Sequence, residues 1–289
     1  MESERIKTYI IVFFVLLNLA LGGLLVMENR RNWVTTQEAE RILTILANNN
    51  ITLDALPMRH FPPMRPMYIT GFYYQVDALV EMFFPNPTVV RQEERFGGYF
   101  FQDHDSSLSI SGGFVFFESE NGFRSRQLAV QSPELANVNA MQTIDNFIAS
   151  YFPTFVQDSS MVLGDGEATR IIYRQEYRGH LIHSNFIEFI LTPVGIVQIE
   201  MQFGEVVGFT GTPTNIFSVD EALLIFAQRV HHITQVTPKT IVHIDLAYFQ
   251  EYFSEQNTPY QGAPFYRIFT YCSGDRPFLI NAFTNIIID

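Results

Sequence analysis

The chain of 289 residues has one cysteine, one tryptophan and only two lysines. A lone cysteine cannot form an intrachain disulfide, which excludes the class of small secreted domains that depend on such cross-links. Cys272 lies in a strand-like stretch without a neighbouring base, so we interpret it as a structural thiol and not a nucleophile. Basic residues number 18 against 30 acidic ones, and the net charge of −12 makes nucleic acid a poor partner.

Catalytic signatures are missing as well. The sequence contains no HExxH, Walker, GxGxxG or GxSxG motif, so we predict that the protein is not an enzyme and holds no cofactor or metal. His180 and His183 have the spacing of metal ligands on a helix, but they fall on a turn and a strand, where positions three apart face opposite sides. Asp103-His104-Asp105 is typical of a polar hairpin loop, and it is also the best place for an unrecognised hydrolytic site.

What the sequence does contain is one long uncharged run, Tyr9–Met27. As an α-helix this run would span roughly 28 Å, close to the thickness of the hydrocarbon core of a bilayer. The residues from Val26 to Arg31 form no small-x-small cleavage site, which favours a retained anchor over a cleaved signal peptide. We therefore predict a cytoplasmic tail over residues 1–8, a transmembrane helix over 9–27, and all remaining residues outside the cytoplasm, in a single-pass protein of the cell membrane.

Inside the uncharged run, Asn18 is the only strongly hydrogen-bonding side chain. An unpaired amide in lipid costs on the order of several kcal/mol, and a hydrogen bond to a neighbouring helix would relieve that cost. Gly22 lies one turn further along the same face and would permit close approach of a partner helix. The residues Asn18, Gly22, Phe14 and Leu25 therefore form a candidate docking stripe. The alternative is that Asn18 bonds back to its own helix.

Three later segments have the apolar periodicity of helices. They are Thr35–Ala47 with the capping box Thr35-x-x-Glu38, Met141–Tyr151 before Pro153, and Ser218–Val230 with the capping box Ser218-x-x-Glu221. The pair His231-His232 follows the third segment, where positive charge favours the end of a helix. A proline-rich passage between Pro57 and Pro66 is a poor candidate for regular structure.

Strand-like sequence alternates with these helices. It occupies Gly98–Gln102, Ser107–Ile110, Phe114–Glu118, Ser125–Val130, Thr169–Tyr177, Leu181–Leu191, Val194–Phe203, Ile241–Phe249, Phe265–Cys272 and Phe278–Ile288. Helix followed by antiparallel sheet, used more than once, defines an α+β architecture. We predict an N-terminal module over 28–131 and a C-terminal α+β region over 132–289, with a further boundary near 212–217.

Three segments together resemble the YycI/YycH regulators. They are FVLLNLAL in the uncharged run, YRQEYRGHLIHSNFIEFILTPVGIVQIEM over residues 173–201, and APFYRIFTYCSGDRPFLINAFTN over residues 263–285. The Tyr-Arg-Gly-His hairpin and the closing Asn-Ala-Phe-Thr strand are more similar to YycI than to YycH. The resemblance implies a protein without catalytic activity that associates with the WalK (YycG) sensor histidine kinase, which controls cell-wall metabolism. The passage from Pro57 to Val130 carries none of the likeness.

These observations leave three hypotheses. The first is an accessory protein that modulates a WalK-like two-component sensor kinase, alone or with a YycH-like protein, through contacts in the lipid bilayer and outside it. The second is an anchored binding module for a cell-wall or small-molecule ligand, which the many aromatic residues would suit. The third is a tethered hydrolase whose site would lie at His104 and Asp105.

Overall fold

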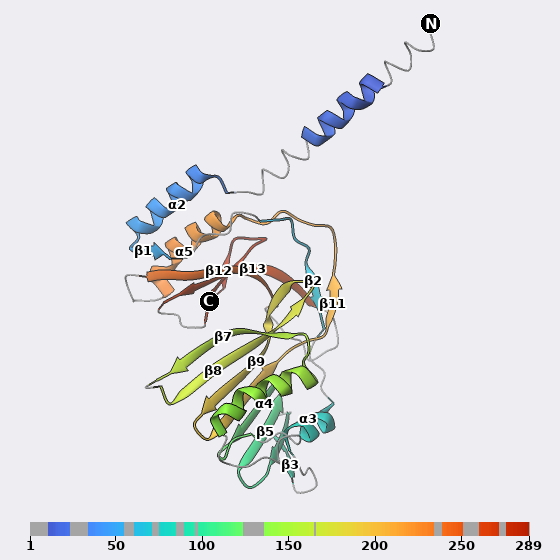
Figure 1. Ribbon diagram of the computed structural model, residues 1–289, viewed down its shortest axis with the longest axis vertical. Coiled ribbons are helices and arrows are strands. Elements are labelled where there is room, and N and C mark those ends of the chain that lie inside the picture. The colour runs from blue at the N-terminus through green and yellow to red at the C-terminus, as the bar shows by residue number, and fades with distance from the viewer. Residues whose placement is uncertain are drawn as a thin grey trace.

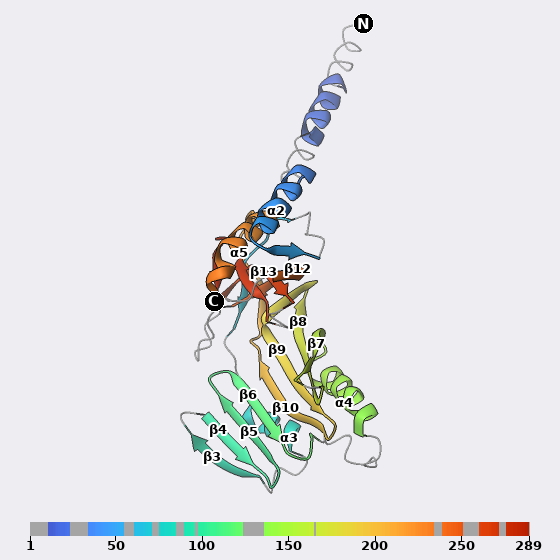
Figure 2. The same cartoon turned by 90° about the vertical axis from the view of Figure 1, so that its left-hand side faces the viewer.

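The computed structural model describes residues 11–23, 34–54, 61–70, 75–84, 90–95, 98–123, 136–164, 166–233, 239–250, 260–271 and 276–288. Its labelled helices are α2 (Thr36–Asn48), α3 (Val76–Phe83), α4 (Ala136–Tyr151) and α5 (Val219–Ile233). A further helix covers residues 11–23 and extends away from the sheet in both views (Figures 1 and 2).

The strands are β1 (Ile51–Leu53), β2 (Met67–Ile69), β3 (Arg91–Arg95), β4 (Gly98–Gln102), β5 (Ser106–Ser111), β6 (Phe114–Ser119), β7 (Phe155–Leu163), β8 (Ala168–Tyr177), β9 (His180–Thr192), β10 (Gly195–Gln202), β11 (Val206–Phe209), β12 (Lys239–Phe249), β13 (Tyr260–Thr270), β14 (Phe278–Asn281) and β15 (Ile287–Ile288). Hydrogen bonds join the described strands into one sheet along the path β11-β2-β13-β12-β9-β10-β6-β5-β4-β3. β7 and β8 extend it beside β9, while β1 pairs with β12, and β14 and β15 follow β13.

Local signals set the helices as the sequence predicts. The Thr35 hydroxyl accepts from the Glu38 backbone N–H, and the Glu38 carboxylate accepts from the Thr35 N–H, so the predicted capping box begins α2. The Ser218 N–H donates to the Glu221 carboxylate at 2.8 Å in front of α5. α4 ends at Tyr151, before Pro153, which cannot continue a helix.

Two hydrophobic cores divide the molecule into an upper and a lower lobe, as oriented in Figure 1. The upper lobe contains α2, α5, β1, β2 and β11–β15, and its core includes Leu46, Met67 and Phe226. The lower lobe contains α3, α4 and β3–β10, and its core includes Phe117 and Phe147. Each lobe buries the apolar stripes of its helices against its part of the sheet, which is the main source of its stability.

The lower core is built largely from phenylalanine rings. Phe83 stacks on Phe117 at 4.9 Å between ring centroids, and Phe147 meets Phe189 edge to face at 5.9 Å. The Tyr173 hydroxyl donates to the Asp145 carboxylate at 3.1 Å and so ties α4 to β8. Burial and the nearby carboxylate raise the pKa of Tyr173 to about 12, so the phenol stays protonated.

The predicted strand meander is confirmed. β8, β9 and β10 are antiparallel neighbours, with Ile172 opposite Glu188 and Glu188 opposite Glu200. Arg178 and Gly179, which form the turn between β8 and β9, both have positive φ. The predicted strand Ser125–Val130 and Cys272 lie outside the described residues.

The predicted fold class is wrong in its plan of repeated modules of helix and antiparallel sheet. The described strands instead form one large mixed sheet that runs through both lobes. Two of its pairings are parallel, β1 with β12 and β9 with β12, where Tyr248 lies opposite Ile182. Alternation along a strand shows which side chains share a face but not which strand lies beside it, so the continuous sheet could not be derived from periodicity.

The predicted transmembrane helix over 9–27, and with it the single-pass location, is also corrected by the structure. Among the described helices, none combines the length and the apolar character needed to cross a membrane. The part of this helix that the structure describes, residues 11–23, rises about 20 Å at 1.5 Å per residue, against roughly 30 Å of hydrocarbon. The predicted tail 1–8 lies outside the described residues.

The two lobes draw on residues from both sides of the predicted module boundary. α2 and β1 lie in the upper lobe with α5 and β12, although they are distant in sequence. α3 and β3–β6 lie in the lower lobe with α4 and β7–β10. The limits 28–131 and 132–289 stay predictions, and the lobes are defined by their hydrophobic cores.

Candidate functional site

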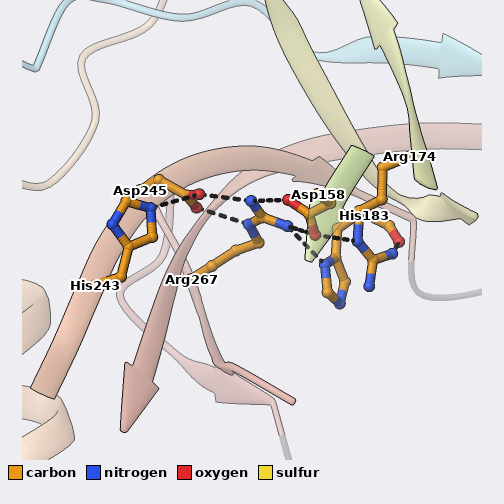
Figure 3. Close-up of polar contacts among 6 residues, drawn as sticks. All are labelled: Asp158, Arg174, His183, His243, Asp245 and Arg267. Atoms are coloured by element: carbon orange, nitrogen blue, oxygen red, sulfur yellow. Dashed lines mark hydrogen bonds and ion pairs between the residues drawn. The ribbon is translucent and has the colours of Figure 1, made fainter. Parts of the chain in front are cut away.

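A chain of charged side chains joins the two lobes where β7, β8, β12 and β13 meet (Figure 3). Its centre is Arg267 on β13, whose side chain is 1% exposed. Asp245 lies directly opposite on β12 and accepts from Arg267 at 2.7 and 2.5 Å. Asp158 on β7 accepts from the two terminal nitrogens of Arg267 at 2.8 and 2.9 Å, so the guanidinium is held on two sides.

Asp158 also connects these charged side chains to the lower lobe. The Arg174 Nε on β8 donates to Asp158 at 2.8 Å, and another nitrogen of the same guanidinium donates to the His183 carbonyl. The register between β7 and β8 shifts between Gln157 and Ser159, which leaves Asp158 in a β-bulge. A bulge redirects its side chain, and here it places one carboxylate between two arginines.

The neighbouring charges in this row of side chains shift the pKa values of Asp158 and Arg267. Burial on its own raises the pKa of Asp158, but hydrogen bonds and charge from Arg267 and Arg174 outweigh it and bring the pKa below its ordinary value. Burial lowers the pKa of Arg267, and its two carboxylate partners outweigh that effect and raise it above the ordinary value. We refer to Asp158, Arg174, Asp245 and Arg267, two acids and two bases, as the buried ion network.

His183 packs beside the buried ion network but forms no ion pair with its members. Burial, together with the positive charges of Arg174 and Arg267, lowers the pKa of His183 well below its ordinary value. The ring stays neutral and lies against Phe249, with 5.9 Å between centroids. Because its pKa is low, this imidazole is a weak base.

A second polar contact at the junction uses Asn185, which is fully buried. β9 carries three extra residues between the pairs Arg174–Phe186 and Gln175–Ile182, and Asn185 is one of them. Its amide nitrogen donates to the Gly204 carbonyl at 2.9 Å, and its amide oxygen accepts from the Gly204 N–H at 3.2 Å. A Cβ at Gly204 would lie 2.1 Å from the Thr70 oxygen, so only glycine fits this approach.

An open cavity of about 600 Å³ lies beside Arg174 and His183, and both residues line it. Its floor is the face of β8, β9, β10 and β6 that points away from the lower core, and its wall comes from the upper lobe. The lining consists of Gly112, Phe114, Arg170, Ile172, Arg174, His183, Ser184, Phe186, Glu188, Glu200, Gln202, Phe249, Gln250, Arg276 and Pro277. Arg170 binds Glu188 at 2.7 Å within it. The cavity offers charges of both signs beside aromatic rings, which suits the binding of a small ligand.

The structure describes three of the four residues of the predicted docking stripe, Phe14, Asn18 and Gly22. The Asn18 amide donates to the Phe14 carbonyl at 2.8 Å, four residues earlier on the same helix. This contact is the alternative that the sequence left open. Gly22 has open space around it, and Leu25 lies outside the described residues. Docking through these residues stays a prediction.

The other residues singled out in the sequence lie apart from the buried ion network. His104 is exposed in the loop between β4 and β5, and Asp105 accepts from the Asn121 amide at 2.8 Å as in a polar hairpin loop. The His180 ring packs against Phe209 and Tyr248, away from any cluster of acids. No group of three or more His, Cys, Asp or Glu side chains among the described residues is placed to hold a metal.

The sequence reasoning missed the buried ion network, although one signal was present. Arg267 and Asp245 each stand alone within a strand-like apolar run, where a charge needs a partner of opposite sign. The partner itself could not be identified because it depends on strand register. Asp158 falls in a stretch for which no strand was predicted, so its role had no sequence signal.

Comparisons with known proteins show a likeness in fold alone. No protein family model matches the chain, and no curated protein matches it. An uncharacterized protein from Eubacterium rectale is similar in structure, with a TM-score of 0.53 and 10% identity over 87% of this chain and 98% of that one. The Bacillus megaterium YpeB C-terminal domain matches with a TM-score of 0.36 and 10% identity over 76% of this chain and 96% of that domain. The second likeness is too distant to carry an argument.

Proposed function

We propose that this protein is a non-enzymatic accessory protein that modulates a two-component sensor histidine kinase by direct contact. The finer form of the proposal is a YycI-like partner of a WalK-like kinase, acting alone or with a YycH-like protein. The observation that carries it is the position of the two longer segments on which the sequence resemblance rests. Residues 173–201 and 263–285 meet at the buried ion network, where Asp158 bridges Arg174 and Arg267.

The way in which the lobes are joined supports a role in regulation by contact. The network and the continuous sheet hold the two lobes in one arrangement, so a partner that touches both would meet a fixed surface. β3 and β7 each pair on one side only among the described strands, and such edges can accept a strand from another protein. A partner that binds one signalling state of a kinase more tightly than the other shifts the equilibrium between them.

The test is a kinase assay with purified proteins. The full chain is added to a full-length WalK-like kinase from the same cell, with and without a YycH-like protein, and autophosphorylation is followed over time. We expect a saturable change in the rate and co-purification of the two proteins. An unrelated sensor kinase is the control and should not respond. Failure to bind, together with an unchanged rate in both conditions, would refute the proposal.

A further inference from the structure

The cavity beside Arg174 contains a buried hydroxyl without a partner. Ser184 lies in the three-residue bulge of β9 and is 4% exposed. Among the described residues, no group hydrogen-bonds its Oγ atom, and Ser184 is one of the residues that line the cavity. A buried hydroxyl without a hydrogen bond costs free energy, so its retention at a cavity wall points to a ligand that supplies the partner.

Two carboxylates on the cavity floor oppose each other directly. Glu188 on β9 and Glu200 on β10 are cross-strand partners and share one face of the sheet. Arg170 neutralises Glu188 at 2.7 Å, whereas no described residue hydrogen-bonds the Glu200 carboxylate. Burial and the charge of Glu188 raise the pKa of Glu200, although Arg170 and Arg276 act in the opposite direction. A cation placed at Glu200 would relieve both the repulsion and the loss of hydration.

The rim of the same cavity offers the complementary charge. Arg276 is exposed, lies within electrostatic range of Glu200, and forms no ion pair with a described residue. Arginine is well suited to bind a carboxylate through two parallel hydrogen bonds. Phe114, Phe186 and Phe249 provide apolar surface in the same cavity.

We propose that this cavity binds a short peptide with free termini, whose ammonium group contacts Glu200 and whose carboxylate contacts Arg276. An apolar side chain of the peptide packs against the phenylalanine rings, and a backbone group completes the hydrogen bonding of Ser184. A volume of about 600 Å³ accommodates two or three residues and lies within the range of small-ligand sites. For the hypothesis of a ligand-binding module, this inference names the chemical class of the ligand. It does not depend on regulation of a kinase.

The experiment is isothermal titration calorimetry of the full chain with the dipeptide alanyl-phenylalanine. Its N-acetylated form and its C-terminal amide are titrated in parallel, since each lacks one of the two charges. We expect saturable binding of the zwitterion with a Kd below about 1 mM, and binding at least about tenfold weaker for each blocked form. If the acetylated form binds as tightly as the zwitterion, the cavity is only an anion site and the proposal is overturned. Absence of zwitterion binding would overturn it as well.

Glu200→Gln and Arg276→Gln test the residues, with Glu167→Gln and Arg229→Gln on exposed positions as matched controls. Each cavity variant should weaken binding about tenfold or more, while the controls leave it unchanged. Glu200→Gln should also raise the midpoint of thermal unfolding slightly, because it removes a like-charge pair. Wild-type affinity in a folded Glu200→Gln protein would overturn the proposal, and the thermal scan shows that the variant is folded.

Discussion

At the scale of single residues, Arg267 is the side chain on which most of the junction depends. Replacing it with methionine keeps much of its volume but leaves Asp158, which is 8% exposed, next to a single remaining arginine. Breaking a buried pair from one side costs about 3–5 kcal/mol. We expect Arg267→Met to lower the free energy of unfolding by about 3 kcal/mol or more, as measured by urea denaturation.

Two further variants decide whether this loss comes from the ion network. Adding Asp158→Asn to Arg267→Met should recover part of the loss, because it removes the carboxylate that was left without its main partner. Arg229→Met, on the exposed face of α5, should change the unfolding free energy by less than about 0.5 kcal/mol. A loss of the same size in Arg229→Met would contradict a specific role for Arg267.

His183 gives the protein a measurable pH dependence. Its pKa is lowered well below the ordinary value by burial and by the neighbouring arginines, so it stays neutral in the folded state while the unfolded chain takes up a proton. The stability it provides is therefore present above about pH 6.5 and is lost as the pH falls below that value. We expect the urea midpoint to decline between about pH 7 and pH 5, and His183→Gln to flatten this decline.

His180 contributes in the same direction, because burial also lowers its pKa. For this reason His183→Gln should flatten the pH profile only in part. Asp158 acts in a separate window: its pKa is lowered, so the stability that it provides is lost only below about pH 4. His104→Gln, in an exposed loop, is the control, and an equal effect there would refute the assignment to His183.

At the scale of elements, the close passage of two backbones at Gly204 fixes β2 and β11 against the lower lobe. Any side chain at Gly204 would collide with the Thr70 oxygen, which is backbone and cannot rotate away. We expect Gly204→Ala to cost about 1–3 kcal/mol in unfolding free energy, as overpacking does. Gly23→Ala has open space around it and should be neutral or slightly stabilising in its helix, so it serves as the matched control.

The elements also differ in how well the sequence predicted them. α2 and α5 were predicted because their capping boxes act over three residues of chain, and β8–β10 because alternation marks a half-buried strand. α3 and β7 were not predicted. α3 has the apolar spacing of a helix at Val76, Leu79, Val80 and Phe83, but it is only eight residues long. β7 has one buried residue, Phe155, and its other residues are exposed or half-buried, so it shows no clear alternation. Short elements depend on tertiary packing more than on their own periodicity.

At the scale of the whole molecule, the two hydrophobic cores and the ion network between them make a prediction about cooperativity. In the wild-type protein we expect β12 of the upper lobe and β10 of the lower lobe to become exposed in one step, as followed by hydrogen exchange with mass spectrometry. In Arg267→Met the cores remain but their link is weakened, so the two strands should exchange at different rates. Identical exchange in the variant would show that the continuous sheet alone couples the lobes.

The sequence by itself determined where helices begin, which strands alternate, the excess of acidic charge and the absence of known catalytic motifs. These features depend on neighbours within a few positions of the chain. The tertiary structure alone decided that the strands form one mixed sheet, that Asp158 meets Arg267 across 109 positions, and that Glu188 faces Glu200 over a cavity. Strand register and bulges set these contacts, and they result from the packing of the whole chain, because no local preference specifies which distant strand lies alongside.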